Sequence, residues 1–294
     1  MTLWTAISDA IERATGRPFD AEGARGVGGG SISRSFLAED HGTRYFVKVN
    51  APDLAEMFEA EAAGLALLAA PGVIRVPAPV CHGRHPDGAF LVLEHVEFGV
   101  GDAAGERQLG EGLAAIHRET RTVFGWDRDN TIGSTPQPNT PEDDWVRFFA
   151  RHRLGHQLDL VAAGGGHARL VDMGRSLVER LPALFEDYRP AASLLHGDLW
   201  GGNAAFDAGG RPVIFDPAVY FGDRESDLAM TELFGGFSPE FYRAYREAWP
   251  LDAGYETRRD LYQLYHVLNH LNLFGGGYAG SARRLTERLL AVCG

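Results

Sequence analysis

The sequence predicts an α+β protein of two lobes, a small β-rich lobe over residues 1–97 and a larger helical lobe over residues 98–294. Strand-like patterns with one helix between them fill the first segment, whereas long helical periodicities fill the second. The stretch 97–101 contains two glycines and marks the expected boundary. A chain of this length buries about 75% of its unfolded surface, so its core needs no disulfide or metal.

The composition is typical of a soluble globular protein and excludes several classes of partner. The 28 Lys and Arg residues against 40 Asp and Glu residues give a formal charge of −12, and no basic run is present, so we expect no nucleic-acid ligand. Because no window approaches 18 apolar residues and no signal peptide is recognisable, we expect no membrane contact and a cytoplasmic location. Cys81 and Cys293 lie outside any C-x-x-C spacing, which predicts neither a zinc site nor a redox pair and fits a reducing compartment.

The elements of the N-terminal lobe follow from apolar periodicity and turn residues. Two helices are expected, over residues 1–13 and 54–70, and Pro71–Gly72 ends the second. Four strands are expected, over residues 32–38, 44–50, 73–77 and 89–94. Turns are expected at Asp40–His41–Gly42, His82–Gly83 and Pro86–Asp87–Gly88.

The C-terminal lobe shows helical periodicity over most of its length. Seven helices are expected, at roughly 102–119, 142–162, 168–185, 225–234, 239–249, 256–273 and 281–292. Thr140 and Ser238 each precede a proline and are the expected N-caps of two of them. Two short apolar runs, 193–196 and 212–216, end in polar residues, and we expect them to form a small hairpin with chemistry at its ends.

The strongest motif is the run from His196 to Asn203, which has the shape H-x-D-x-x-x-x-N and is followed 13 residues later by Asp216. This composition gives roughly 0.015 such matches by chance. Phosphoryl transfer needs a carboxylate beside the attacking hydroxyl and oxygen ligands for Mg²⁺. Asp198, Asn203 and Asp216 supply that set. Each alone could instead cap a turn.

The N-terminal lobe contains residues suited to holding a nucleotide. A glycine-rich stretch precedes the first expected strand, and its backbone N–H groups could close over phosphates; the candidates are Gly28, Gly29, Gly30 and Ser31. Alone, such a run is as often a plain loop. Lys48 lies in mid-strand and would contact the α- and β-phosphates, unless it is an edge lysine that points to solvent. We expect Glu61 on the following helix to hold it, and Glu59 to lie on a solvated face.

A strand running into the lobe boundary could bind the adenine ring. The segment 90–96 passes from strand into the boundary, where exposed backbone groups are available for hydrogen bonds. Glu94 and Val96 are the main-chain candidates. ATP and Mg²⁺ are therefore the expected cofactors.

The order of glycine loop, lysine, helix glutamate, hinge, H-x-D-x-x-x-x-N and aspartate resembles the protein-kinase-like fold, in its small-molecule kinase branch. Departures disfavour a protein kinase: Gly197 stands in place of arginine, Pro217–Ala218 rather than Phe-Gly follows Asp216, and no Ala-Pro-Glu is present. The glycine loop is also not strictly G-x-G-x-x-G.

More closely, nearly the whole chain resembles the fructosamine kinase, or ketosamine-3-kinase, family. The residues that carry the resemblance are 28–33, 46–48, 61–65, 74–77, 196–203 and 215–225, with Trp200 and the segment Gly222–Glu225 the most specific. The resemblance implies ATP-dependent phosphorylation of the 3-hydroxyl of a ketosamine, carried by an amino acid or a protein lysine. The product is unstable, so the family is associated with removal of glycation. Because Ser31 stands where relatives often have cysteine, we expect no disulfide switch.

The resemblance also suggests roles for individual residues. Asp198 would orient or deprotonate the sugar hydroxyl, and Asn203 and Asp216 would bind Mg²⁺. Trp200 offers an aromatic face to a sugar or an amine, unless it packs under the loop. Asp223 would meet the substrate, unless it belongs to a surface ion network. Asp227 resembles the buried aspartate that braces the catalytic loop in this fold.

Three histidines are expected to have structural or surface roles. His117 is expected to pack against the catalytic segment. His266 and His270 have metal-pair spacing but lack the H-E-x-x-H arrangement, so we interpret them as helix-packing or surface residues.

Two other functions compete with the ketosamine kinase. An aminoglycoside- or choline-type kinase would also suit an acidic protein, and a nucleotide-binding module without turnover belongs to a different class. The sequence does not decide between fructosamine, ribulosamine and other ketosamines, nor between free amino-acid adducts and glycated proteins. The oligomeric state is equally open.

Overall fold

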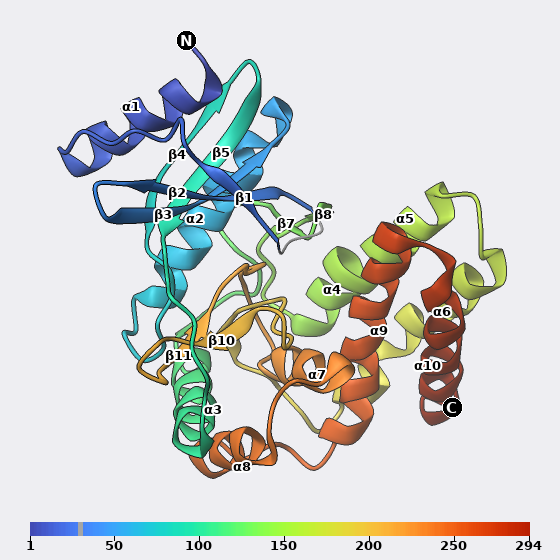
Figure 1. Cartoon of the computed structure of the whole chain (residues 1–294). Coiled ribbons are helices and arrows are strands. Elements are labelled where there is room, and N and C mark those ends of the chain that lie inside the picture. The colour runs from blue at the N-terminus through green and yellow to red at the C-terminus, as the bar shows by residue number, and fades with distance from the viewer. Residues whose placement is uncertain (29–31) are drawn as a thin grey trace.

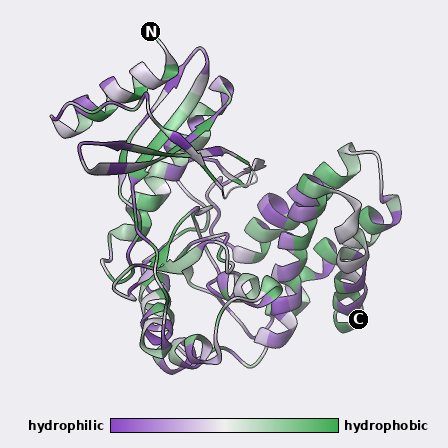
Figure 2. Cartoon of the chain, in the orientation of Figure 1, coloured by the Kyte–Doolittle hydropathy of each residue, from purple (hydrophilic) through white to green (hydrophobic). Residues whose placement is uncertain are grey.

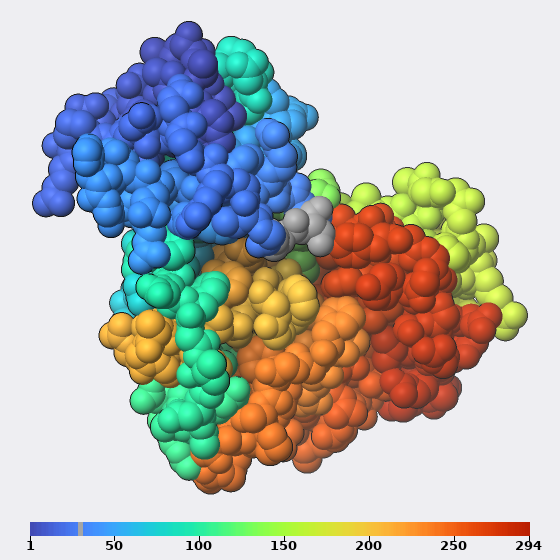
Figure 3. Space-filling view, viewed as in Figure 1, coloured from blue at the N-terminus to red at the C-terminus, as the bar shows by residue number. Residues whose placement is uncertain are grey.

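The computed structural model describes residues 1–28 and 32–294 and shows two lobes joined by a connector at residues 95–101 (Figure 1). The N-terminal lobe holds a five-stranded antiparallel sheet, and the C-terminal lobe is largely helical. Figure 3 shows the first lobe, in blue, resting on the second. The expected boundary at residue 97 lies within the connector.

The sheet has the strand order β1-β2-β3-β5-β4, so its two edges are β1 and β4. The strands are β1 (Arg25–Val27), β2 (Arg34–Asp40), β3 (Thr43–Asn50), β4 (Pro79–His85) and β5 (Gly88–Glu94). Helix α1 (Leu3–Thr15) contacts β4, and α2 (Ala55–Ala69) contacts β4 and β5. Strand β5, which lies between β3 and β4, is buried over Gly88–Leu93, as expected for a strand covered on both faces.

The C-terminal lobe is built from helices and three small sheets. The helices are α3 (Ala103–His117), α4 (Trp145–Phe149), α5 (His156–Ala163), α6 (Ala168–Arg180), α7 (Glu225–Phe234), α8 (Pro239–Ala248), α9 (Tyr255–Phe274) and α10 (Ala279–Val292). A π-helical turn (Ala150–Gly155) joins α4 to α5. The short strands are β6 (Thr120–Arg121), β7 (Asn130–Ile132), β8 (Thr135–Gln137), β9 (Ala192–Leu195), β10 (Ala204–Phe206), β11 (Pro212–Ile214) and β12 (Tyr220–Gly222).

Two apolar cores stabilise the lobes. The smaller core joins α1 to one face of the sheet through Ile7, Ile11, Val47 and Val92. The larger core runs from α2 and the other face of the sheet through the whole helical lobe. Most helices carry both hydrophobic and hydrophilic residues in Figure 2, which fits amphipathic helices with one buried face. Because the larger core spans both lobes, α2 is anchored to the helical lobe as well as to its own sheet.

Most expected helices and the strands next to the nucleotide segment are confirmed, whereas three local expectations are wrong. No strand forms over 73–77; only Arg75 bridges to Val213 of β11, because this loop crosses to the other lobe. His82–Gly83 lies within β4 and is not a turn. The helix expected from residue 142 begins at Trp145, because Asp144 and not Thr140 caps it through the backbone N–H of Arg147.

The expected hairpin between residues 193–196 and 212–216 is also wrong. Strand β9 pairs with β12 and β6, and β11 pairs with β10. The two runs nevertheless meet at their ends, because the backbone N–H of Ala218 donates to the carbonyl oxygen of His196 at 2.8 Å. The chemistry at their ends is therefore brought together by a different pairing. Among the helices of residues 1–28 and 32–294, none is both long and apolar enough to span a membrane.

Candidate active site

A cavity of about 990 Å³ lies between the two lobes and collects most of the candidate residues. It is lined by the sheet above, the connector at one end, and the segment after β9 together with α9 below. The candidates that line it are Gly28, Lys48, Glu61, Glu94, Val96, Asp198, Trp200, Asn203 and Asp216. The remaining glycine-loop candidates, Gly29, Gly30 and Ser31, lie outside the described residues.

The catalytic loop that follows β9 is held from below by Asp227, on the first turn of α7. One carboxylate oxygen of Asp227 accepts from the backbone N–H of His196 at 2.7 Å, and the other accepts from that of Gly197 at 2.8 Å. His117 Nε2 lies 3.1 Å from the same carboxylate. Asp227 and His117 are both fully buried, so these bonds face no competition from water. The expected bracing by Asp227 is confirmed, and His117 is linked to the catalytic segment through Asp227.

Glycine is required at position 197 for two reasons. Its φ is +84°, a left-handed conformation that side chains rarely adopt, and a Cβ there would lie 2.0 Å from the carbonyl oxygen of Ala218. The loop therefore makes a sharp turn directly before Asp198, whose side chain enters the cavity.

Asp198, Asn203 and Asp216 meet at the floor of the cavity. Asn203 Nδ2 donates to the backbone oxygen of Asp198 at 2.8 Å and lies 3.3 Å from its Oδ2. It also lies 3.4 Å from the backbone oxygen of Asp216. The amide nitrogen is thus committed to the protein, which leaves the amide oxygen of Asn203 for a ligand. Asp216 has φ of +57°, an uncommon conformation for a non-glycine residue and one often associated with functional sites.

Burial, together with the nearby carboxylates of Asp216 and Asp227, raises the pKa of Asp198 to about 7. The hydrogen bond from Asn203 opposes this shift. A carboxylate poised near neutral pH is well matched to accepting a proton from a hydroxyl. A cation bound next to Asp216 would lower the pKa of Asp198, because it offsets the charge of that neighbour.

Lys48 joins the two lobes across the cleft. Its Nζ lies 2.6 Å from Glu61 Oε1 on α2 and 2.7 Å from Asp216 Oδ1. Burial alone would lower the pKa of Lys48, but the two carboxylates outweigh it and the pKa is raised. The expected pairing with Glu61 is confirmed. Glu59 instead pairs with Arg128 at the surface, as expected for a solvated face.

The donor set at the cavity floor fits Mg²⁺. This ion prefers oxygen ligands and is commonly held by one or two carboxylates together with substrate phosphates. The carboxylate of Asp216 and the amide oxygen of Asn203 are such ligands. No group of three or more His, Cys, Asp or Glu side chains within the described part of the chain could hold a metal alone. The arrangement therefore suits an ion that arrives with a nucleotide.

The connector end of the cavity is apolar and suited to a flat ring. Leu93, Val96, Phe98 and Phe215 line it, and Phe98 stacks on Phe215 with ring centroids 5.4 Å apart. The backbone N–H of Glu94 is already bonded to the carbonyl oxygen of Ala78. Any adenine contact at Glu94 would therefore involve its carbonyl oxygen.

Arg75 ties this end of the cavity to the hairpin that carries the metal-ligand candidates. Its guanidinium contacts the carboxylates of Glu94, at the end of β5, and of Asp207, at the tip of β10–β11. Its backbone also bonds to β11 through Pro212 and Ile214. Asn203 precedes β10 and Asp216 follows β11. Arg75 therefore aligns the ring-binding end of the cavity with the metal-ligand candidates at its floor. The sequence marked Arg75 only through the family resemblance.

We expect Arg75→Gln to weaken ATP binding roughly 3- to 10-fold, since hydrogen bonds to charged groups are worth about 1.5–3 kcal/mol before solvent screening. The acceptor KM is expected to change much less, because Arg75 lies away from the acceptor end. Arg211→Gln is the matched control: Arg211 contacts Asp207 but not Glu94. Calorimetric titration with an ATP analogue measures both variants. An equal loss of affinity in the Arg75→Gln and Arg211→Gln variants would show that Arg75 merely neutralises Asp207.

The opposite end of the cavity is aromatic. Four aromatic residues count among the exposed large hydrophobic residues of the described chain, and all four line this cavity: Phe98, Trp200, Phe234 and Phe274. The last three gather with His270 and Tyr278 in what we call the aromatic corner. Ring centroids lie 6.3 Å apart for Trp200–Phe234 and 4.8 Å for Phe234–His270. For His270 with Phe274 and Tyr278 they are 5.6 and 5.2 Å apart.

Trp200 does not pack under the catalytic loop. Its side chain is 40% exposed and lies over Gly202, where a Cβ would come within 2.3 Å of the indole ring. His270 Nδ1 lies 2.8 Å from the carbonyl oxygen of His266 and so carries the proton, and burial lowers the pKa of His270. Burial therefore favours the neutral form of this imidazole. Sequence reasoning missed His270 as a cavity residue, and only His266 fits the packing interpretation.

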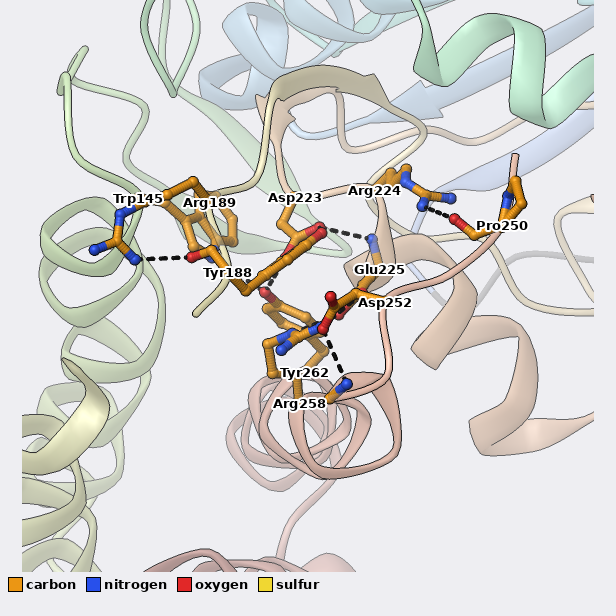
Figure 4. Close-up of polar contacts among 11 residues, drawn as sticks. Trp145, Tyr188, Arg189, Asp223, Arg224, Glu225, Pro250, Asp252, Arg258 and Tyr262 are labelled. Carbon is orange, nitrogen blue, oxygen red and sulfur yellow. Dashed lines mark hydrogen bonds and ion pairs between the residues drawn. The ribbon is translucent and has the colours of Figure 1, made fainter. Parts of the chain in front are cut away.

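Asp223 lies outside the cavity, which corrects the expectation that it meets the substrate. It is fully buried; its carboxylate accepts from the hydroxyls of Tyr188 at 3.0 Å and Tyr262 at 2.5 Å (Figure 4). Next to it, Glu225 forms a buried ion pair with Arg258 at 2.8 Å. This network is interior and not a surface one. Because it fixes the start of α7, it holds Asp227 under the catalytic loop.

Comparisons with known proteins match this chain over nearly its whole length. The family model described as fructosamine kinase matches residues 3–292. A protein of Synechocystis sp. named "Probable ketoamine kinase" is 46% identical over 290 residues, 98% of this chain and 97% of that protein. A chloroplastic protein-ribulosamine 3-kinase of Arabidopsis thaliana is 43% identical over 269 residues, 90% of this chain and 82% of that protein.

Solved structures also align with nearly the whole chain and share its fold. A crystal structure from Haemophilus somnus, described as "Putative fructosamine-3-kinase", aligns with a TM-score of 0.90 at 29% identity, covering 98% of this chain and all of that one. Aminoglycoside phosphotransferase APH(4)-Ia aligns with a TM-score of 0.62 at 15% identity over 98% of both chains. The second likeness shows a common fold alone. The expected two-lobe, protein-kinase-like fold is confirmed.

Proposed function

The chain belongs to the fructosamine kinase family, and from this membership and the geometry of the cleft we propose that it transfers the γ-phosphoryl group of ATP to the 3-hydroxyl of a ketosamine. The acceptor is a sugar joined through its amine to an amino acid or a protein lysine. One observation carries the proposal: Lys48 with Glu61, Asp198, Asn203 and Asp216 meet in one cavity. The phosphorylated adduct is unstable, so the outcome is removal of glycation, in the cytoplasm.

The residues divide the work of phosphoryl transfer between them. Lys48, held by Glu61, contacts the α- and β-phosphates, and main-chain groups at Glu94 and Val96 receive the adenine ring. Gly28, with the glycines that follow it, closes over the phosphates. Asn203 and Asp216 hold Mg²⁺, which when bound neutralises charge on the transferring phosphoryl group. Asp198 orients the acceptor hydroxyl and accepts its proton.

The aromatic corner receives the acceptor. A ketosamine carries an amine that is protonated in part near neutral pH, and aromatic faces attract such a cation. Among the charged side chains of the described residues that line the cavity, none belongs to the aromatic corner, and burial favours the neutral form of the His270 imidazole. The corner therefore favours a cationic amine with an apolar substituent. Its exposed rim, Trp200, Phe234 and Phe274, also leaves room for an amine carried by a larger molecule.

We expect Trp200→Ala to raise the KM for the ketosamine roughly 3- to 30-fold, since cation–π contacts are worth about 0.5–2 kcal/mol. The KM for ATP should stay nearly unchanged, because Trp200 lies at the acceptor end. Phe98→Ala provides the mirror control at the connector end, where the KM for ATP should rise and that for the ketosamine should not. Steady-state kinetics with both substrates varied gives the four constants. A Trp200→Ala enzyme with an unchanged acceptor KM would contradict the placement of the acceptor.

The proposal is tested by Mg²⁺-dependent ATP consumption with ribulose-lysine and fructose-lysine, alongside an aminoglycoside and choline. Turnover on either ketosamine, with none on the controls, supports the proposal and ranks the two sugars. Turnover on the aminoglycoside or choline alone overturns the acceptor while leaving the catalytic residues in place. The absence of turnover with any acceptor, together with ATP binding, would leave a nucleotide-binding module.

A further inference from the structure

Lys48 is the one lysine of this chain; of its 28 Lys and Arg residues, all others are arginine. Lysine and arginine differ as nucleophiles. An arginine guanidinium stays protonated under all ordinary conditions, whereas a lysine amine can lose its proton and react. Most proteins place both lysine and arginine at their surface. In this chain every lysine or arginine position other than 48 holds arginine, which does not react in this way. The chain therefore has a single side-chain amine.

Although Lys48 lines the cavity, the fold engages its amine on two sides. The residue is 8% exposed, and its Nζ is held at 2.6 Å by Glu61 and at 2.7 Å by Asp216. Lys48 lies in the middle of β3, where its backbone is paired with Ser35 of β2 and Leu91 of β5. Fraying at the ends of the strand therefore does not release the side chain. A sugar that reached Nζ would have to separate it from both carboxylates. Both carboxylates accept hydrogen bonds from Nζ, so the nitrogen is engaged on two sides and is not free to approach the carbonyl carbon of a sugar.

A reducing sugar becomes a ketosamine through a neutral amine. The nitrogen lone pair forms a bond to the aldehyde carbon, one water molecule leaves to give an imine, and the imine rearranges to the ketoamine without any outside oxidant or reductant. We infer that no side chain of this folded protein can undergo this reaction, so that the enzyme resists the modification that its proposed function reverses. The biological meaning of this inference rests on the proposed function, but the chemistry does not.

The consequence for the site is direct. A ketosamine on Lys48 would place a sugar between Glu61 and Asp216 and would block binding of the ATP phosphates at this position. A kinase with surface lysines would also present its own adducts as competing substrates. This chain avoids both problems through the same feature of its sequence.

The test is incubation of the folded protein with ribose, followed by intact mass and peptide mapping. We expect no adduct on the peptide that contains Lys48. An adduct at the α-amine of the chain is identified from its own peptide and assessed separately. Two matched variants supply the positive control, Arg17→Lys and Arg169→Lys, because both arginines are exposed and lie outside the cavity lining. Each variant should gain one adduct at the new lysine. The unfolded wild-type protein should gain an adduct at Lys48.

Two results would overturn the inference. The first is an adduct on Lys48 of the folded protein at a rate similar to that of the new lysine in the Arg17→Lys variant. The second is an adduct on an arginine side chain under conditions where ribose alone is present. None of these readouts depends on kinase turnover, so failure of the proposed function would leave the result intact. Conversely, loss of the adduct from glycated Arg17→Lys protein upon addition of wild-type enzyme and Mg²⁺-ATP would test the proposed function on a protein-bound ketosamine.

Discussion

Asp198→Asn is expected to lower kcat by about 10²- to 10⁴-fold, the usual contribution of a positioned general base. The asparagine keeps the shape of the side chain but does not accept the proton of the acceptor hydroxyl. The wild-type rate with Mg²⁺-ATP should fall on the acid side, because protonation of Asp198 removes the general base. This limb should lie below pH 7, because the bound cation lowers the pKa of Asp198 from the value of about 7 that it has without cation. The residual rate of Asp198→Asn should lack the limb altogether.

Stability measurements separate this loss of activity from misfolding. The pKa of Asp198 is raised in the folded state, so its contribution to stability is greatest at acid pH and is lost as the pH rises through about 7. Asp198→Asn should therefore unfold at an equal or higher temperature than the wild type at pH 8, with the difference shrinking toward pH 4. A variant with near-normal turnover, or with a clearly lower melting temperature at pH 8, contradicts the role assigned to Asp198.

Asp227→Ala is expected to destabilise the protein by about 3–5 kcal/mol and also to reduce kcat strongly. Two buried backbone N–H groups, those of His196 and Gly197, and the ring of His117 would lose their acceptor. Each unpaired buried donor costs about 1–3 kcal/mol. Because these donors belong to the catalytic loop, Asp198 would lose its position as the loop relaxes. Urea unfolding and steady-state kinetics on the same preparation measure the two effects.

Asp227→Asn is the informative companion to this variant. It keeps one oxygen acceptor but replaces the other oxygen with a donor that faces a backbone N–H, so it should recover only part of the stability. The pKa of Asp227 is held below its usual range, since hydrogen bonds from His117 and the loop backbone outweigh burial. Its stabilising effect should thus be lost only at acid pH. If Asp227→Ala unfolds like the wild type, the loop is braced by other contacts.

The parts of the site that could be predicted from sequence are those encoded locally. Asp198 and Asn203 belong to one loop, and Asp216 follows the adjoining hairpin at a fixed spacing, so the motif alone predicts that the three side chains act together. The pairing of Lys48 with Glu61 was predictable because a strand followed by a helix leaves few carboxylates within reach.

The parts that could not be predicted depend on distant segments. His270 enters the cavity because α9 packs against α7, and nothing in its i, i+4 spacing with His266 shows which of the two faces the ligand. Asp223 stands in a segment rich in polar residues, yet two tyrosine hydroxyls from distant positions bury it. The run 73–77 has the composition of a strand, but its partner is β11 of the other lobe. Strand pairing of this kind is settled by tertiary packing and not by local preference.

The most direct test of the central claim is the position of the phosphoryl group on the product. Ribulose-lysine is incubated with the enzyme and Mg²⁺-ATP, and phosphorus and carbon NMR follow the products, with Asp198→Asn as the blank. We predict a phosphate ester at the 3-oxygen of the sugar, followed by release of free lysine. Formation of ADP and inorganic phosphate alone, or an ester at another hydroxyl with no release of lysine, would contradict the account.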